Sequence, residues 1–229
     1  MRSPTAGLVL TLTLALSATA AAQSPTPVPS PSAAPTGAAG CQARTALLGG
    51  IGRASIVAFT GKIFGDHVCA TVANLATDSF TASLGPSAAP QALVSAAVAG
   101  GTGAALSVGP SGSLALVPGA AETGSVAVGP VLIAPGGRLA VEGGDANALP
   151  RVVLAYAGQR VLVIGTSPVT LVDLARVLRD QPDLFGADAF ERAVVLTSGP
   201  AATLSLQTDA GVFGSPPAAA QVLSLIKRG

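Results

Sequence analysis

The sequence predicts an α+β fold, a mixed β-sheet with packed helices in one domain. Residues 41–229 provide the chain length of one domain. Many short runs of β-branched and apolar residues in this part are separated by Gly and Pro, which is typical of strands and turns. Near the C-terminus a pair of such runs is followed by an amphipathic helix and another apolar run. This order indicates helices packed on a mixed sheet.

The first 22 residues have the pattern of a secretory signal peptide. Arg2 supplies a positive charge, and the apolar run Gly7–Leu16 of about ten residues follows it. This run is too short to span a bilayer, which takes about 20 apolar residues. The small residues Ala20-Ala21-Ala22 fit a cleavage site. We therefore expect residues 1–22 to be cleaved and the protein to be secreted or periplasmic. An uncleaved anchor and a lipoprotein signal are the alternatives.

Residues 23–40 (QSPTPVPSPSAAPTGAAG) are rich in Pro, Ser and Ala. Pro fixes φ and removes a backbone donor, and the small side chains offer no core, so we expect a disordered linker. A spacer and a ligand for a Pro-binding partner both fit this composition, and the spacer is favoured.

The charge and hydropathy of the chain argue against two classes of partner. Lys and Arg number 12 against 11 Asp and Glu, so no basic surface for nucleic acid is indicated. No second apolar stretch reaches membrane length, so we expect no membrane span after signal cleavage.

The two cysteines, Cys41 and Cys69, both follow the signal peptide. An oxidising compartment permits a disulfide between them, and two free buried thiols are the alternative. His67 is the single histidine, and no Cys pair has the spacing of metal ligands. We expect a Cys41–Cys69 disulfide, no metal site and no cofactor.

The first half of the domain is predicted to consist mainly of strands. Residues 54–60 and 67–75 are rich in β-branched and apolar residues, and a turn with two Gly separates them. Residues 89–99 (APQALVSAAVA) have the composition of a helix, which Gly100 and Gly101 would end. Short apolar runs then predict a meander of strands over residues 104–108, 113–117, 125–128, 131–134 and 138–141.

A hairpin opens the second half of the domain. Residues 151–156 and 159–164 flank Ala157-Gly158 and predict two paired strands. Further along the chain we expect a second short helix over residues 183–192 and strands over residues 193–196, 203–207 and 222–226.

A helix is predicted from Thr170 onward. One apolar stripe runs along it at helical spacing, formed by Leu171, Leu174, Ala175 and Leu178. Thr170 with Asp173 resembles a capping box, and Pro182 ends the helix. We expect the stripe to pack on a sheet that contains Val194–Leu196.

Four landmarks follow one another between Gln91 and Ile226. Ala99-Gly100-Gly101-Thr102 ends the predicted helix, and Gly129-Pro130-Val131-Leu132 begins a strand. Arg151 begins the hairpin, and the helix TLVDLARVLRDQPDLFG leads through the strand AVVL to Thr197–Ala202. In order and spacing these segments resemble the phosphodiester glycosidase domain family, which includes the enzyme that uncovers mannose 6-phosphate and exported bacterial proteins. The resemblance implies the fold of that family for residues 41–229, most clearly for 91–226.

The sequence departs from this family where the family motifs carry chemical groups. An Asn-Gly-Gly-Phe-Phe turn and an Asp-Gly-Gly-Pro-Ser-Thr loop are typical of the family. The degenerate motif positions here are Ala99, Thr197, Ser198 and Ala201. The substrate-binding candidates that remain are Arg151, Gly100, Gly101 and Gly199. Glycoside cleavage typically needs two positioned carboxylates, and the matched positions supply none. Arg151 either clamps a phosphate or forms a structural ion pair.

Other candidate groups lie outside these landmarks. Asp66 and His67 are adjacent, but neighbours on a strand point to opposite faces, so we expect a turn residue beside a half-exposed histidine. Glu142 and Asp145 in a Gly-rich loop either bind calcium or substrate or are solvated. A cluster of carboxylates at the landmark loops, drawn from Asp66, Asp78, Glu142 or Asp145, would indicate an enzyme.

The sequence therefore predicts an exported, catalytically degenerate protein with a binding or structural role in the envelope or outside the cell. Its expected partner is a sugar phosphate or an envelope glycan. The alternative is an active hydrolase, a glycosidase that cleaves sugar-1-phosphodiesters. The chain has no Trp and one Tyr, so it offers few rings for stacking on sugars.

Overall fold

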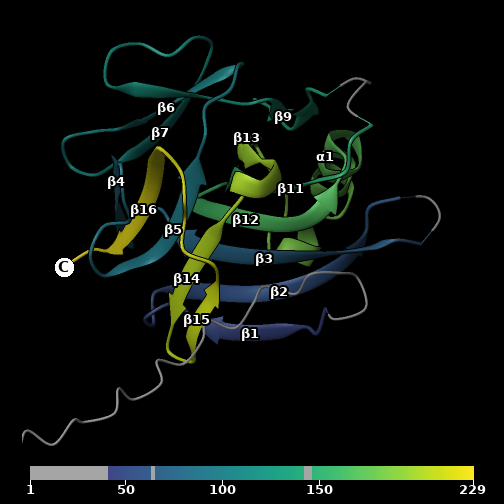
Figure 1. Cartoon of the computed structure of the whole chain (residues 1–229), viewed down its shortest axis with the longest axis horizontal. Coiled ribbons are helices and arrows are strands. Elements are labelled where there is room, and N and C mark those ends of the chain that lie inside the picture. The colour runs from purple at the N-terminus through teal and green to yellow at the C-terminus, as the bar shows by residue number, and fades with distance from the viewer. Residues whose placement is uncertain (1–40, 63–64, 142–145) are drawn as a thin grey trace, which may run out of the picture. The chain divides into compact units, whose positions relative to one another are not determined.

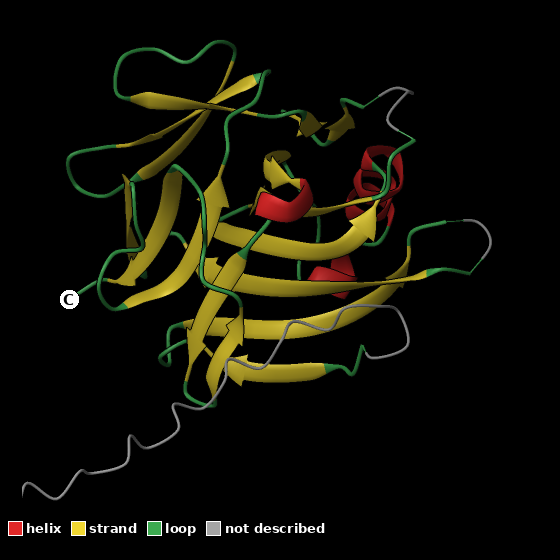
Figure 2. Cartoon of the chain, in the orientation of Figure 1, coloured by secondary structure: helices red, strands yellow, loops and turns green. Residues whose placement is uncertain are grey.

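The structure, a computed structural model, describes residues 41–62, 65–141 and 146–229 (Figure 1). The predicted signal peptide, residues 1–22, and the predicted linker, residues 23–40, lie outside this part, as do Glu142 and Asp145. The described residues are mostly β, with one α-helix and three antiparallel sheets (Figure 2). No helix in this part is long and apolar enough to cross a membrane.

The largest sheet, which we call sheet A, has eight strands. From one edge to the other they are β1 (Arg44–Leu47), β2 (Gly52–Thr60), β3 (His67–Ala76), β12 (Arg160–Val169), β11 (Leu149–Ala157), β13 (Arg192–Ser198), β9 (Val131–Ala134) and β10 (Arg138–Leu139). The pairing of β3 with β12 joins the N-terminal strands to the C-terminal hairpin.

Two smaller sheets complete the domain. Sheet B has the order β15 (Gly211–Gly214), β14 (Leu204–Thr208), β5 (Ala92–Val98), β16 (Gln221–Lys227) and β4 (Phe80–Gly85). Sheet C has the order β7 (Leu114–Pro118), β6 (Ala104–Val108) and β8 (Ser125–Val128). In Figure 1 the strands of sheet B cross the direction of the strands of sheet A.

One face of sheet A packs against sheets B and C. Leu154 and Leu196 of sheet A share a buried cluster with Leu206 and Leu225 of sheet B and Leu106 of sheet C. All five side chains have an exposed fraction of 0%. Since alternate residues of a strand point to the same face, this cluster is the core between the layers.

The opposite face of sheet A carries α1 (Leu171–Asp180). The predicted stripe is buried in a cluster with Val195 of sheet A, and its members are Leu171, Leu174, Ala175 and Leu178. The hydroxyl of Thr170 accepts a hydrogen bond from the N–H of Asp173 at 3.1 Å and donates to its carboxylate at 2.7 Å. The predicted helix, its N-terminal cap and its packing on the sheet are therefore confirmed.

The predicted helix over residues 89–99 is wrong, because Ala92–Val98 forms strand β5. This strand lies between β14 and β16 in sheet B, and nearly all of its residues are buried. Pairing with a strand on each side and burial on both faces outweigh the helical propensity of its Ala residues. Gly100 and Gly101 therefore follow a strand.

Three further predictions of the fold are corrected. Instead of a helix over residues 183–192, only the 3-10 turn η2 (Pro182–Phe185) forms, and Gly186 with a φ of 72° ends it. All strand pairings in the described residues are antiparallel, so the sheet is not mixed. The packed helices of the prediction reduce to one α-helix in this part of the chain. Strands β1, β4 and β15 have no counterpart among the strands predicted by range.

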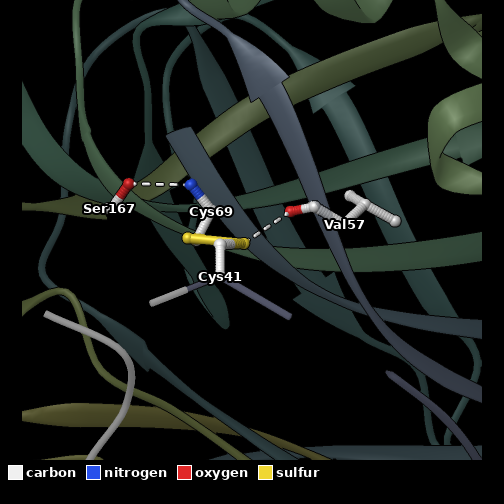
Figure 3. Close-up of a disulfide and its surroundings, with 4 residues drawn as sticks. All are labelled: Cys41, Val57, Cys69 and Ser167. Carbon is white, nitrogen blue, oxygen red and sulfur yellow. Dashed lines mark hydrogen bonds between the residues drawn. A yellow bond between two sulfur atoms is a disulfide. The ribbon is translucent and has the colours of Figure 1, made fainter. Parts of the chain in front are cut away.

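The predicted disulfide is present (Figure 3). The Cα atoms of Cys41 and Cys69 lie 5.6 Å apart. Cys69 belongs to β3, and its N–H donates to the hydroxyl of Ser167 in β12 at 2.9 Å. Because Cys41 precedes the edge strand β1, the bond fastens the first described residue to the interior of sheet A.

Candidate functional site

The loops that carry the family-like landmarks meet at one end of β5 and β13. The N–H of Ala99, directly after β5, donates to the carbonyl of Leu196 at 3.1 Å. The N–H of Gly129 donates to the carbonyl of Val195 at 2.9 Å, and the N–H of Val195 donates to the carbonyl of Pro130 at 3.0 Å. Segments that are distant in the sequence are therefore adjacent in the structure.

Two glycines of these loops pack backbone against backbone. A Cβ atom on Gly101 would lie 2.5 Å from both the N and the O of Gly129. Gly129 has a φ of 147° and lies against the carbonyl of Thr102, and its peptide bond to Pro130 is cis. Only residues without a Cβ allow this approach, so Gly101 and Gly129 have a structural role.

Arg151 of β11 is almost fully buried, with an exposed fraction of 2%. Each nitrogen of its guanidinium group donates a hydrogen bond within the protein. Nε donates to the carbonyl of Val169 at 3.1 Å, Nη1 to Oγ of Ser198 at 2.9 Å, and Nη2 to the carbonyl of Asn147 at 3.1 Å. Arg151 therefore ties together the ends of β12 and β13 and the segment before β11.

Thr197 stands where the family has Asp, and it pairs with Val152 in the β11–β13 register. It is 3% exposed, and its Oγ1 has no hydrogen-bond partner among the described residues. A charged carboxylate at so buried a position is costly unless it is paired. After Ser198 the chain turns through η3 (Gly199–Ala201), in which Ala201 offers no functional group. Gly100 and Gly199 have positive φ angles of 85° and 74°.

A pocket of about 180 Å³ lies beside Arg151, and we call it the hydroxyl pocket. Pro150, the neighbour of Arg151, lines it, and so does Thr166, whose Oγ1 accepts from the N–H of Arg151 at 3.2 Å. Its hydroxyl groups come from Thr71, Thr166, Ser167, Thr203 and Ser215. None of the described residues around it is ionisable, since Cys69 is held in the disulfide. The described residues of the hydroxyl pocket therefore offer hydrogen bonds without an acid or a base.

A second pocket of about 240 Å³ shares Ser167 and Pro168 with the lining of the hydroxyl pocket. Asp66 and His67 line it together, although we expected them to diverge, because Asp66 precedes the first residue of β3. The carboxylate of Asp66 lies 3.1 Å from Nζ of Lys62, and Asp173 of α1 is also in the lining. No three His, Cys, Asp or Glu side chains in the described ranges are placed to hold a metal ion.

Of the carboxylates that the sequence offers, the structure places Asp66 and Asp78 apart, before and after strand β3. Asp66 lies in the second pocket, and Asp78 is exposed in the turn between β3 and β4. Glu142 and Asp145 lie outside the described residues. The hydroxyls of Thr166 and Ser167 were not predicted as site residues. The predicted strand stops at residue 164, whereas β12 continues to Val169.

No family model matches the sequence, and no curated protein matches it. The structure is similar to the catalytic domain of zebrafish N-acetylglucosamine-1-phosphodiester alpha-N-acetylglucosaminidase, solved in a form auto-inhibited by its pro-peptide. The TM-score is 0.57 at 12% identity, over 82% of this chain and 88% of that chain. A hypothetical protein from Synechocystis is also similar, with a TM-score of 0.55 at 11% identity, over 82% of this chain and 64% of that chain. The domain therefore has the phosphodiester glycosidase fold, as the order of the landmarks predicted.

Proposed function

We propose that this chain is an exported phosphodiester-glycosidase-like protein that has lost catalysis and has a binding or structural role in the envelope or outside the cell. The signal-peptide pattern supports export, and the Cys41–Cys69 disulfide is consistent with an oxidising compartment. The similarity to an enzyme named for a sugar phosphodiester favours a sugar phosphate or an envelope glycan as the ligand.

The composition of the hydroxyl pocket carries this proposal. Glycoside cleavage typically needs one group that donates a proton and a second that attacks or activates water. The described residues around the pocket supply five hydroxyl side chains and no ionisable group. Hydroxyl groups bind sugars and phosphates through hydrogen bonds, so this pocket supports binding better than turnover.

The alternative is an active hydrolase of sugar-1-phosphodiesters. It is favoured by the second pocket, which is lined by Asp66, His67 and Asp173 and shares Ser167 and Pro168 with the hydroxyl pocket. A substrate that extended across Ser167 would meet a carboxylate and an imidazole there. These groups could act as acid and base.

Turnover of a chromogenic sugar 1-phosphodiester by the purified mature protein separates the two functions. We expect no turnover above the uncatalysed rate, together with calorimetrically measurable binding of the corresponding sugar phosphate. Thr203→Ala in the hydroxyl pocket should weaken this binding. Ser111→Ala, in an exposed turn, is the matched control and should leave it unchanged.

Measurable turnover with a defined residue dependence would establish the alternative instead. Its signature is activity that is lost in Asp66→Asn, His67→Gln or Asp173→Asn and kept in Asp78→Asn. Thermal unfolding of each variant shows whether a loss of activity reflects a loss of the fold. Arg151 is a poor target for this test because its removal takes the donor from three hydrogen-bond acceptors that tie separate segments together, one of them the buried carbonyl of Val169.

A further inference from the structure

A groove of about 570 Å³ lies away from the hydroxyl pocket and shares no lining residue with it. Its walls come from strands β1, β2, β3 and β12 and from the turn η2. The side chains that matter chemically are Arg53, Arg160, Asp183, Thr45 and Ser55. We call this the arginine groove.

Asn74 of β3 fixes the geometry of the arginine groove. It is 6% exposed, and its Nδ2 donates to the carbonyl of Gly186 at 3.0 Å and to that of Phe185 at 3.4 Å. Its Oδ1 accepts a hydrogen bond from Nε of Arg160. Asn74 therefore ties the end of η2 to sheet A and orients Arg160. Arg53 stands directly opposite Asn74 in the β2–β3 register, and such pairs share one face of a sheet.

The two arginines, with Asp183 as the one carboxylate of the lining, give the groove a net positive charge. The side chain of Arg53 makes no ion pair and no hydrogen bond within the described residues, and the side chain of Arg160 donates there through Nε alone. Both residues are exposed, so a ligand in the groove can reach their remaining N–H groups. Guanidinium groups are planar donors whose geometry matches carboxylate and phosphate oxyanions. The groove therefore offers the hydrogen-bond donors and the charge that an oxyanion requires.

The other polar groups of the arginine groove fit a sugar. Asp183 is exposed on η2, and its carboxylate can accept hydrogen bonds from hydroxyl groups of a ligand. The hydroxyls of Thr45 and Ser55, paired across β1 and β2, add donors and acceptors at the other wall. A volume of about 570 Å³ lies within the range of small-ligand pockets, roughly 300–1,000 Å³.

We propose that the arginine groove binds an acidic sugar unit of a glycan. Arg53 and Arg160 hold its oxyanion, and Asp183, Ser55 and Thr45 bind its hydroxyl groups. The oxyanion is a carboxylate of a uronic acid or a phosphate ester, which present the same fork of acceptors to a guanidinium group. This site goes beyond the proposed function, because it does not involve Arg151 or the hydroxyl pocket.

Two other ligand classes fit the arginine groove less well. A nucleic acid needs an extended basic surface, whereas Asp183 lies in the groove and the chain has a formal net charge of +1. A neutral sugar is usually held by an exposed ring, whereas Phe185, the aromatic residue of the lining, is 2% exposed. The oxyanion is therefore the feature that the groove selects.

Isothermal titration calorimetry of the mature protein at low salt tests the proposal. The probes are trigalacturonate, N-acetylglucosamine 1-phosphate, neutral galactotriose and inorganic phosphate. We expect saturable binding of at least one acidic sugar, tighter than that of the other two probes. Arg53→Gln and Arg160→Gln should each weaken it about tenfold or more, since both remove charge-assisted hydrogen bonds. Arg138→Gln removes an exposed arginine on β10 and should leave it unchanged.

The acidic sugar that binds identifies the oxyanion as a carboxylate or a phosphate ester. Asp183→Ala should weaken the binding of the acidic sugar and should not weaken the binding of inorganic phosphate. The proposal is overturned if no acidic sugar binds, if galactotriose or inorganic phosphate binds as tightly, or if Arg53→Gln behaves as Arg138→Gln does. The side chain of Arg53 makes no hydrogen bond within the described residues, so its substitution tests the groove and leaves the side-chain hydrogen bonds of Asn74 in place.

Discussion

Removal of the Cys41–Cys69 disulfide should destabilise the domain substantially. The bond closes a loop between residues separated by 28 positions and fastens the start of the domain beside the edge strand β1. Cys41→Ala is the cleanest perturbation. Cys41 is partly exposed, whereas Cys69 is 5% exposed in β3, so a truncation at position 41 removes little core packing.

The expected loss follows from the length of the loop. The chain-entropy model gives a stabilisation of about 3.6 kcal/mol at 25 °C for a loop of 28 residues. In a domain of this size each kcal/mol shifts the Tm by about 2–4 °C, so a decrease of about 7–14 °C is expected. The first amides to lose protection from hydrogen exchange should be those of Arg44–Leu47, because β1 pairs with β2 alone.

Urea unfolding of the oxidised protein, of Cys41→Ala and of the Cys41→Ala/Cys69→Ala double variant measures this loss. The oxidised protein treated with a reductant is a control that keeps both cysteines. All three disulfide-free forms should have a similar free energy of unfolding. A loss below about 1 kcal/mol in each of them would refute the loop-closure reasoning.

Three further predictions concern pH and the helix α1. Tyr156 is the single tyrosine in a chain without Trp, and burial raises its pKa to about 12 while Arg192 acts in the opposite direction. The tyrosinate absorbance should therefore titrate near pH 12. Protonated Tyr156 makes its full contribution to the free energy of unfolding below the unfolded pKa of 10.0. This contribution should be lost as the pH rises through the folded pKa. Leu174→Ala should lower the free energy of unfolding by about 2–5 kcal/mol in urea, because Leu174 is fully buried. Thr170→Ala should lower it by about 1 kcal/mol, because it removes the cap of α1.

Matched variants on the same helix control for these effects. Arg176→Ala, on the exposed side of α1, should change the free energy of unfolding by less than about 0.5 kcal/mol. Thr170→Ser keeps the capping hydroxyl and should retain most of the stability. A Leu174→Ala loss as small as that of Arg176→Ala would contradict the packing of α1 on sheet A. A tyrosinate midpoint near 10 would contradict the burial of Tyr156.

The parts of the fold that could be predicted are those specified by local pattern. The stripe from Leu171 to Leu178 and the cap at Thr170 lie within one short segment, so the sequence specifies them locally. Ala92–Val98 becomes a strand only because β14 and β16, more than 100 residues later, pair with it. Its own composition carries no sign of those partners.

In the candidate site, too, the features set by local sequence could be predicted and those set by distant segments could not. The landmark segments could be recognised from their order in the sequence, and hydrogen bonds of Ala99, Gly129 and Val195 join them in the structure. The burial of Arg151 could not be predicted, because its acceptors come from three separate segments. The arginine groove was missed for a similar reason, since Arg53 and Arg160 meet only through the pairing of β3 with its two neighbours.

The place of β16 in sheet B has a consequence for the order in which the chain can fold. Gln221–Lys227 lies between β5 and β4, so the edges that these two strands present to each other stay unpaired until Gln221–Lys227 has been synthesised. In sheet A, β3 can pair with β2 early, but its other edge stays unpaired until β12 has been synthesised. Such non-local pairing is typical of folding in milliseconds to seconds. A polypeptide that crosses a membrane through a narrow translocation channel must stay unfolded during passage. For the export that we propose, this topology would keep the chain unfolded until nearly the whole domain has emerged.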